Sequence, residues 1–152
     1  MALLELNGVR KGYPSPEGEA QTVLDVPSFS LEAGAELAIA GTSGCGKTTL
    51  LNIVAGLLSP DEGEVRFDGD VVSDFGEARR DAWRAKELGY VFQTFHLLGG
   101  YTALENVLLG MMFGPGADRG RAQALLERLG LGHRLSHRCL LYTSDAADDA
   151  NC

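Results

Sequence analysis

Gly41-Thr-Ser-Gly-Cys-Gly-Lys-Thr48 is the stretch of the sequence that decides the fold. It fits the pattern G-x-x-x-x-G-K-[ST], in which glycines let successive backbone N–H groups turn toward the phosphates of a nucleotide. The short apolar run 36–40 precedes it, and the apolar spacing of residues 48–57 after it favours a helix. A helix start adds its positive dipole end to an anion site. We therefore predict a phosphate-binding loop between a buried strand and a helix.

Three side chains of this loop carry the expected chemistry. Lys47 is a point charge that reaches the β- and γ-phosphate oxygens of a nucleotide, so we expect it to serve binding and catalysis. The Thr48 hydroxyl is expected to be a ligand of the Mg²⁺ ion that the nucleotide brings, and Thr49 adds a further donor. The predicted cofactor-binding residues of the loop are Gly41, Ser43, Gly44, Cys45, Gly46, Lys47, Thr48 and Thr49.

Cys45 lies beside Lys47 at the start of the predicted helix, a setting that raises the reactivity of a thiol. A redox switch is one interpretation, and the other is that any small side chain fits this position. Under both interpretations we predict that alkylation of Cys45 blocks nucleotide binding sterically.

The composition is typical of one globular domain, with 45% hydrophobic and 22% charged residues in a chain of 152. The net charge of -8 argues against a nucleic-acid partner, because such proteins present a basic face to the phosphate backbone. No apolar run approaches the roughly 20 residues that cross a bilayer, and the first residues do not form a signal peptide. We therefore expect a cytoplasmic chain in which Cys45, Cys139 and Cys152 are free thiols.

Hydrophobic spacing and turn residues predict the remaining elements. Residues 74–88 form a charged segment that favours a helix, and its basic side chains are interpreted as a solvated face around the single aromatic anchor Trp83. The predicted strands are 3–9, 23–31, 36–40, 64–67 and 89–93, and the predicted helices are 48–57, 74–88, 103–112 and 118–129.

A second motif narrows the class of nucleotide-binding protein. Tyr90-Val-Phe-Gln93 follows Lys47 by about 45 residues and resembles the Q-loop of ABC ATPases. The segments Gly89-Tyr-Val-Phe-Gln-Thr-Phe-His-Leu-Leu98, Thr102-Ala-Leu-Glu-Asn-Val107 and Gly63-Glu-Val-Arg-Phe-Asp-Gly69 resemble the branch with lipoprotein-release and macrolide-export ATPases.

This resemblance implies roles for two further residues. Gln93 is expected to contact Mg²⁺ and the attacking water, which makes it both a catalytic and a metal-binding position. Tyr13 matches the aromatic position that stacks on adenine, a contact expected to contribute about 1 to 3 kcal/mol. The implied cofactors are ATP and Mg²⁺.

The resemblance also implies a fold, partners and a location. The fold class is α/β, a P-loop NTPase (RecA-like) core with an antiparallel β subdomain, here incomplete. The implied partners are an ABC transporter membrane subunit and a second ATP-binding subunit, and the location is the inner face of the cell membrane.

The pattern of the family stops at Arg138, before a signature motif, a Walker B strand and a switch histidine. We interpret residues 1–138 as the N-terminal part of an ABC ATP-binding domain. Residues 139–152 are interpreted as a non-native tail, because their reverse translation permits an in-frame transposase sequencing adapter. The alternative is a genuine acidic tail. His133 and His137 are not interpreted as a zinc site, since Cys139 falls in this tail.

The predicted function is that of an ATP-binding subunit that couples ATP binding and hydrolysis to transport through a membrane partner. The chain as written is expected to supply an ATP-binding half-site with negligible turnover. Two alternatives remain open: a non-catalytic nucleotide-binding fragment, and a soluble ABC ATPase that does not act in transport.

Overall fold

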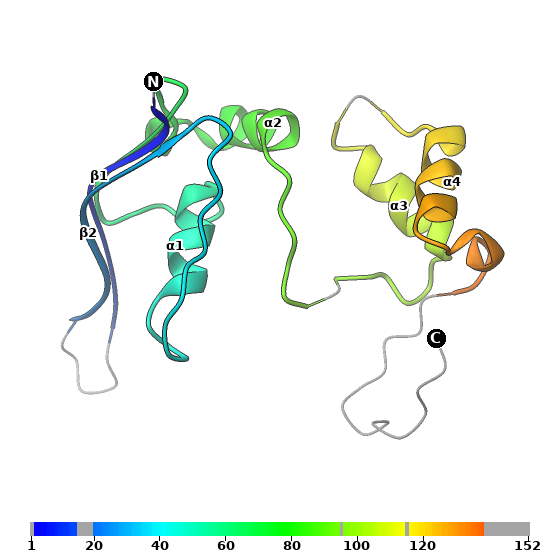
Figure 1. The fold of residues 1–152 in the computed structure, drawn as a ribbon, viewed down its shortest axis with the longest axis horizontal. Coiled ribbons are helices and arrows are strands. Elements are labelled where there is room, and N and C mark those ends of the chain that lie inside the picture. Colours follow the sequence, from blue (N-terminus) through cyan, green and yellow to red (C-terminus); the bar gives the residue numbers. More distant parts are fainter. Residues whose placement is uncertain (1, 15–19, 95, 115, 139–152) are drawn as a thin grey trace. The chain divides into compact units, whose positions relative to one another are not determined.

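The structure of the chain is a computed structural model, and it describes residues 2–14, 20–94, 96–114 and 116–138 (Figure 1). The chain divides into two units, Met1–Tyr90 and Val91–Cys152, and each is described by itself. The tail predicted at residues 139–152 lies outside the described residues.

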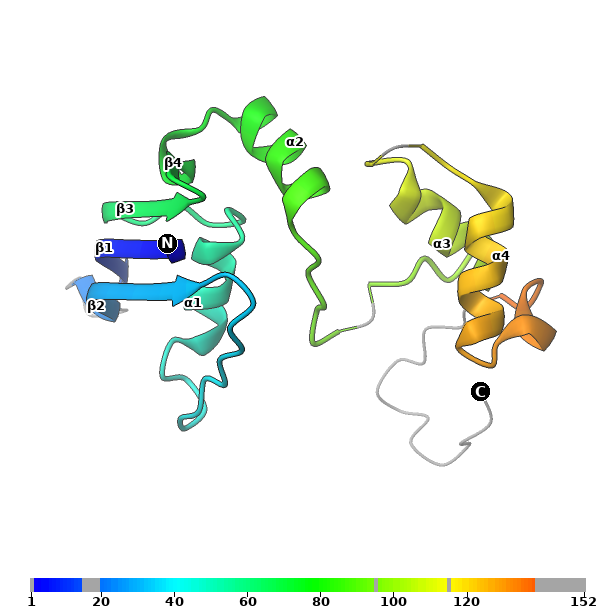
Figure 2. The ribbon, with the colours of Figure 1, turned by 45° about the horizontal axis from the view of Figure 1, so that its top comes forward.

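Four antiparallel strands form the sheet of the first unit (Figure 2). β1 (Ala2–Pro14) lies between β2 (Ala20–Glu32) and β3 (Glu62–Phe67), and the short β4 (Asp70–Val71) pairs with β3 at the edge. Three predicted strands, 3–9, 23–31 and 64–67, are confirmed, and each is longer in the structure. Their alternation of apolar and polar residues buries one face of the sheet.

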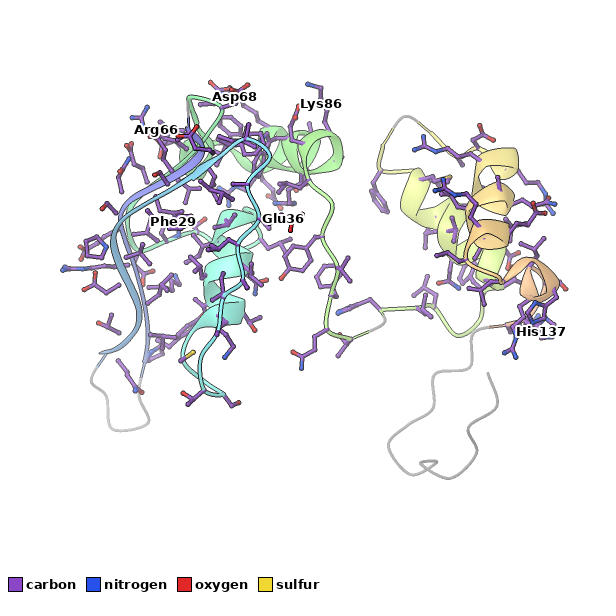
Figure 3. All side chains as sticks on the ribbon, viewed as in Figure 1. Phe29, Glu36, Arg66, Asp68, Lys86 and His137 are labelled. Carbon is purple, nitrogen blue, oxygen red and sulfur yellow. The ribbon has the colours of Figure 1, made fainter. Side chains whose placement is uncertain are left out.

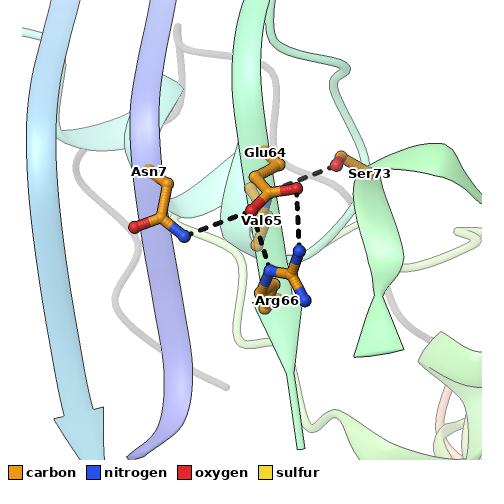
Figure 4. Close-up of polar contacts among 5 residues, drawn as sticks. All are labelled: Asn7, Glu64, Val65, Arg66 and Ser73. Carbon is orange, nitrogen blue, oxygen red and sulfur yellow. Dashed lines mark hydrogen bonds and ion pairs between the residues drawn. The ribbon is translucent and has the colours of Figure 1, made fainter. Parts of the chain in front are cut away.

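Polar side chains tie β3 to its neighbours (Figure 4). Glu64 accepts hydrogen bonds from the Arg66 guanidinium at 2.8 and 3.2 Å and from the Asn7 amide at 3.3 Å. The Arg66 side chain, and after it Asn7, holds the pKa of Glu64 below its usual value. The Ser73 hydroxyl accepts the N–H of Val65 at 3.2 Å. This strand is therefore fixed on both sides.

One face of the sheet packs against α1 (Lys47–Val54), and α2 (Glu77–Glu87) joins the same core. α1 contributes Ile53, which is 2% exposed. α2 contributes Trp83, whose ring meets those of Phe67 and Phe75 edge to face at centroid distances of 5.6 and 6.5 Å. The buried core residues are Leu6, Val9, Leu24, Ile53, Val65, Val72 and Phe75, of which Val72 lies in the 3₁₀ turn Val72–Asp74.

Two helices form the second unit, α3 (Ala103–Met111) and α4 (Arg119–Arg128), followed by the 3₁₀ turn Gly132–Arg134. Thr102 and Glu105 form a reciprocal capping box at the start of α3, and Asp118 caps α4. The backbone then returns to the start of α3, where Ala103 N–H donates to the His137 carbonyl at 2.9 Å. Figure 3 labels His137 at this return. The buried residues of this unit are Leu104, Ala122 and Leu126.

Two strand predictions are wrong. Residues 36–40 and 89–93 have no regular secondary structure, and Leu37 and Ile39 in the first segment are 55% and 39% exposed. Figure 3 marks this segment by Glu36. An apolar run forms a strand only where neighbouring strands pair with it. Every ladder among the described residues belongs to the antiparallel sheet, and none includes these two segments.

The predicted helices are confirmed with shorter bounds. α1 ends before Gly56, whose φ of +65° is left-handed and ends the helix. α2 begins only after Gly76, because the preceding residues form the 3₁₀ turn. None of the helices in the described part of the chain combines the length and apolar character that crossing a bilayer requires.

Candidate functional site

The predicted phosphate loop runs directly into α1. Gly44 and Gly46 have φ of +81° and +88°, a left-handed conformation that glycine adopts without strain. The N–H groups of Lys47, Thr48 and Thr49 have no intrahelical acceptor because they lie in the first turn of α1. Their N-cap, Gly46, has no side chain that could accept from them. Such N–H groups, together with the helix dipole, form an anion-binding site.

The loop is closely packed at two of its glycines. A Cβ atom on Gly46 would lie 2.7 Å from the Val23 carbonyl oxygen of β2, and one on Gly41 would lie 2.6 Å from the Cys45 sulfur. Side chains at these two positions would collide with the neighbouring atoms. At Gly46 the obstructing atom belongs to the backbone, so the loop keeps its shape only with glycine there, whereas at Gly41 the Cys45 side chain would have to move.

Lys47 places a positive charge over this loop. Its ammonium donates to the Gly41 carbonyl at 2.9 Å and to the Thr42 carbonyl at 2.6 Å, and it lies 3.4 Å from the Cys45 sulfur. Cys45 is a free, exposed thiol in the described chain. A cation and unpaired N–H groups therefore meet at one place, and an anion with several oxygens fits this donor set. The effect of alkylating Cys45 stays a prediction.

The other predicted residues of the loop differ in exposure. Ser43, Gly44 and Thr48 are exposed, whereas Thr49 is half-buried on α1. Thr48 thus follows Lys47 directly and is an exposed residue, as a metal ligand at the loop would have to be. Its role as a magnesium ligand stays a prediction.

Tyr13 lies on the same unit near the end of β1. It pairs with Gln21 of β2, and it is 42% exposed. Val23, which contacts Gly46 of the loop, is two residues from Gln21 on the same strand. The structure therefore brings Tyr13 and the loop to the same end of the β1–β2 pair.

Gln93 belongs to the second unit, where it lies exposed in a segment without regular structure. The segment before it is anchored in the first unit, because the Tyr90 hydroxyl donates to the Asn52 amide oxygen of α1 at 2.8 Å. The predicted contact of Gln93 with Mg²⁺ and water stays a prediction.

Beyond the C-terminal end of α1, the structure shows contacts of α2 that sequence reasoning missed. Arg84 of α2 donates to the Gly56 carbonyl at 2.6 Å, just after α1, and Arg80 donates to the Ser59 hydroxyl at 2.9 Å and to the Phe75 carbonyl at 2.8 Å. The interpretation of this helix face as solvated is wrong for these two arginines. The partners of these arginines lie 5 to 28 residues away along the chain, and no local pattern of the sequence predicts the contacts.

Comparison with protein families gives a match to the ABC transporter family over residues 24–145. The lipoprotein-releasing system ATP-binding protein LolD of Pseudomonas syringae pv. tomato is 46% identical over 141 residues, covering 90% of this chain and 61% of that protein. The macrolide export ATP-binding/permease protein MacB 1/2 of Paracoccus denitrificans is 42% identical over 139 residues, covering 90% of this chain and 21% of that protein.

Solved structures give the same result. A dimeric ATP-binding cassette in a post-hydrolysis state, bound to ADP and Pi, superposes with a TM-score of 0.80 at 34% identity and covers 89% of this chain. The chain spans 61% of that cassette and 61% of the LolD protein. These likenesses confirm the predicted fold class, α/β with a P-loop NTPase core and an antiparallel β subdomain.

Proposed function

The chain belongs to the ABC transporter family, and from this membership we propose that it binds ATP at the loop 41–49 as part of an ABC transporter ATP-binding subunit. The observation that carries the proposal is the meeting of the Lys47 ammonium with the uncapped start of α1. The same two features give a polyphosphate both a cation and a set of oriented N–H donors.

The loop would bind phosphates by an exchange of partners. In the structure the Lys47 ammonium donates to the carbonyl oxygens of Gly41 and Thr42. Phosphate oxygens carry more negative charge than these carbonyls, so the ammonium would turn to the β- and γ-phosphates while the first-turn N–H groups bind the same anion. In the whole protein Lys47 would then stabilise the charge on the transferring phosphoryl group.

Two residues are proposed to hold the magnesium ion, Thr48 through its hydroxyl and Gln93 through its side-chain oxygen. When bound, Mg²⁺ neutralises charge on the phosphates. Gln93 would in addition orient the attacking water, and its place in the second unit would let it report the state of the nucleotide to a partner.

Tyr13 is proposed to stack on the adenine ring. Its exposure and its place at the same end of the β1–β2 pair as the loop support this role. Replacing Tyr13 with Ala should weaken ATP binding, and Phe should preserve it, because stacking uses the ring and not the hydroxyl.

For the whole protein we propose ATP hydrolysis coupled to transport. The names of the relatives, a lipoprotein-releasing system protein and a macrolide exporter, point to a membrane subunit as partner. The dimeric cassette points to a second ATP-binding subunit. The location would be peripheral, on the inner face of the membrane and through the membrane subunit.

The binding of ATP by the purified chain tests the proposal. Isothermal titration with ATP and Mg²⁺ should detect binding, and Lys47→Ala should weaken it at least about tenfold, as expected for the loss of charged hydrogen bonds. Lys86→Ala is the matched control, since Lys86 is an exposed lysine of the same unit that pairs with Glu87. Equal affinity of the wild type and the Lys47 variant would remove the loop from the site.

A further inference from the structure

Asp61 makes three contacts with the strand that carries Tyr13. Its carboxylate accepts the Gly12 N–H at 2.8 Å and also bonds the Lys11 ammonium, and its own N–H donates to the Arg10 carbonyl at 2.9 Å. The side chain of Lys11 is only 15% exposed, so this ion pair is partly shielded from water. All three contacts fall on consecutive residues directly before Tyr13.

These contacts lie where β1 separates from β3. The last pair between the two strands joins Arg10 to Glu62, and the pairing is irregular there. Beyond Arg10 the third strand does not pair with β1, so the Gly12 N–H would lack an acceptor on that side. The Asp61 carboxylate supplies the acceptor and continues the ladder by one further bond.

On its other side β1 meets an irregular stretch of β2. Lys11 pairs with Leu24 and Gly12 with Thr22, so Val23 is an extra residue between the two pairs. A bulge of this kind bends the bulged strand and disrupts the ladder locally, so β2 alone holds this part of β1 less regularly. The path of β1 into Tyr13 at this irregular step therefore depends on how Gly12 is held, and Asp61 holds it.

We propose that Asp61 is a positioning residue for the nucleotide base: by fixing Lys11 and Gly12 beside the β2 bulge, it sets the orientation of Tyr13. The inference rests on the proposed function, in which Tyr13 stacks on adenine. The phosphate loop is held by its own contacts at Gly41, Thr42 and Lys47. Asp61 should therefore affect the base contact and leave the phosphate contact unchanged.

Two ligands separate these contacts, ATP and inorganic tripolyphosphate, which carries the phosphates without a base. With the full chain, Asp61→Ala should weaken ATP binding about three- to tenfold, as expected for loss of a hydrogen bond and a partly shielded ion pair. Tripolyphosphate affinity should stay within about twofold of the wild type. Asp61→Asn keeps an acceptor for Gly12 but loses the charge, so its effect should be smaller. Glu62→Gln is the control, because Glu62 is the neighbouring acid and pairs with Arg10.

A double-mutant cycle with Tyr13→Ala completes the test. If Asp61 acts through Tyr13, adding Asp61→Ala to Tyr13→Ala should weaken ATP binding no further. Equal weakening of ATP and tripolyphosphate by Asp61→Ala, or additive effects in the cycle, would overturn the inference and leave the proposed function standing. If Tyr13→Ala leaves the affinities for both ligands unchanged, the stacking role fails and the inference fails with it.

Discussion

The two units of the chain differ in what holds them together. The first has a four-stranded sheet and seven buried core residues gathered from strands, a helix and turns. The second has two helices, a core of three buried residues and exposed side chains such as Phe113, which is 75% exposed. A larger core holds its backbone more firmly against local opening. A site that needs fixed N–H groups therefore belongs in the first unit, and the second is suited to change shape with its surroundings.

The largest effect is expected from truncating one core leucine in each unit. Leu6→Ala truncates a fully buried side chain in the first unit, and Leu126→Ala truncates a buried one, 4% exposed, in the second. Leu6→Ala should lower the free energy of unfolding by about 3 to 5 kcal/mol and abolish ATP binding as the sheet opens. Leu126→Ala should open only the second unit and leave the binding of tripolyphosphate without Mg²⁺ intact, because the loop lies in the first unit.

The single tryptophan, Trp83, makes this comparison measurable, because its fluorescence reports the first unit only. Urea titrations followed by this fluorescence should shift for Leu6→Ala and stay near the wild type for Leu126→Ala. Equal shifts for both variants would mean that the two units unfold as one.

A smaller effect is expected from the glycines of the loop. Gly46→Ala introduces both backbone strain and a contact of 2.7 Å with the Val23 carbonyl, whereas Gly44→Ala introduces strain alone, because nothing lies within 4 Å of the added atom. We expect a loss of about 2 to 4 kcal/mol for Gly46→Ala and about 1 kcal/mol for Gly44→Ala.

Thermal melting of these two variants, with tripolyphosphate titrations, checks the difference. Binding should fail in Gly46→Ala and survive in Gly44→Ala. A Gly46→Ala variant as stable as Gly44→Ala would show that the loop is not packed against β2 as described.

In the second unit the contacts of Asn106 replace those of a large core. Its amide donates to the carbonyls of Leu98, Tyr101 and Thr102 at 3.0 to 3.4 Å and accepts the Leu98 N–H at 2.8 Å. Asn106→Ala should lower the stability of this unit by about 1 to 3 kcal/mol, because it removes the acceptor of the Leu98 N–H and the amide donor shared by these carbonyls.

Hydrogen exchange at the Leu98 amide measures this change directly. It should accelerate in Asn106→Ala and stay unchanged in Gln123→Ala, which removes only an exposed bond to Glu127. The binding of tripolyphosphate without Mg²⁺ should not change in either variant. Weaker tripolyphosphate binding in Asn106→Ala would show that the second unit shapes the phosphate loop.

The smallest expected effect is a difference in acid sensitivity. The Gly12 N–H, and then the Lys11 side chain, hold the pKa of Asp61 below its usual value, and the Thr102 N–H and hydroxyl do the same to the pKa of Glu105. A carboxyl group whose pKa is lower in the folded state adds stability above its unfolded pKa of about 4. That stability is lost as the pH falls through the folded pKa.

Each unit should therefore lose stability below about pH 4, and each should lose less of it after its own substitution. Acid titration of Trp83 fluorescence should become shallower in Asp61→Asn and stay unchanged in Glu105→Gln. The reverse result would assign the acid sensitivity of the first unit to other groups.

Features of the fold that depend on residues adjacent in the sequence were predicted correctly. The glycine loop 41–48 and the four helices follow local patterns of spacing, and the structure has a helix at each predicted place. Residues 36–40 and 89–93 were misassigned because a strand needs a pairing partner, which its own composition does not supply. The contact of Asp61 with Gly12 spans 49 residues and was missed for the same reason.

The residues of the candidate site also divide into those that belong to a local motif and those that do not. The glycines and Lys47 were found because their spacing is a motif, and the structure places them together at the start of α1. Tyr13 was found only through family resemblance, since one exposed tyrosine has no distinctive pattern. What the sequence could not show is the arrangement beside it, a bulge in the neighbouring strand and a carboxylate from a distant turn that bonds Gly12.

The contact between Gly46 and the Val23 carbonyl also constrains how this sequence can diverge. Because the obstructing atom belongs to the backbone, no substitution at position 23 removes it. A larger residue at position 46 could be accepted in a descendant only after an insertion or deletion in β2 had moved the bulge. Loop and strand should therefore change together over evolutionary time, and the glycine should outlast most of the side chains around it.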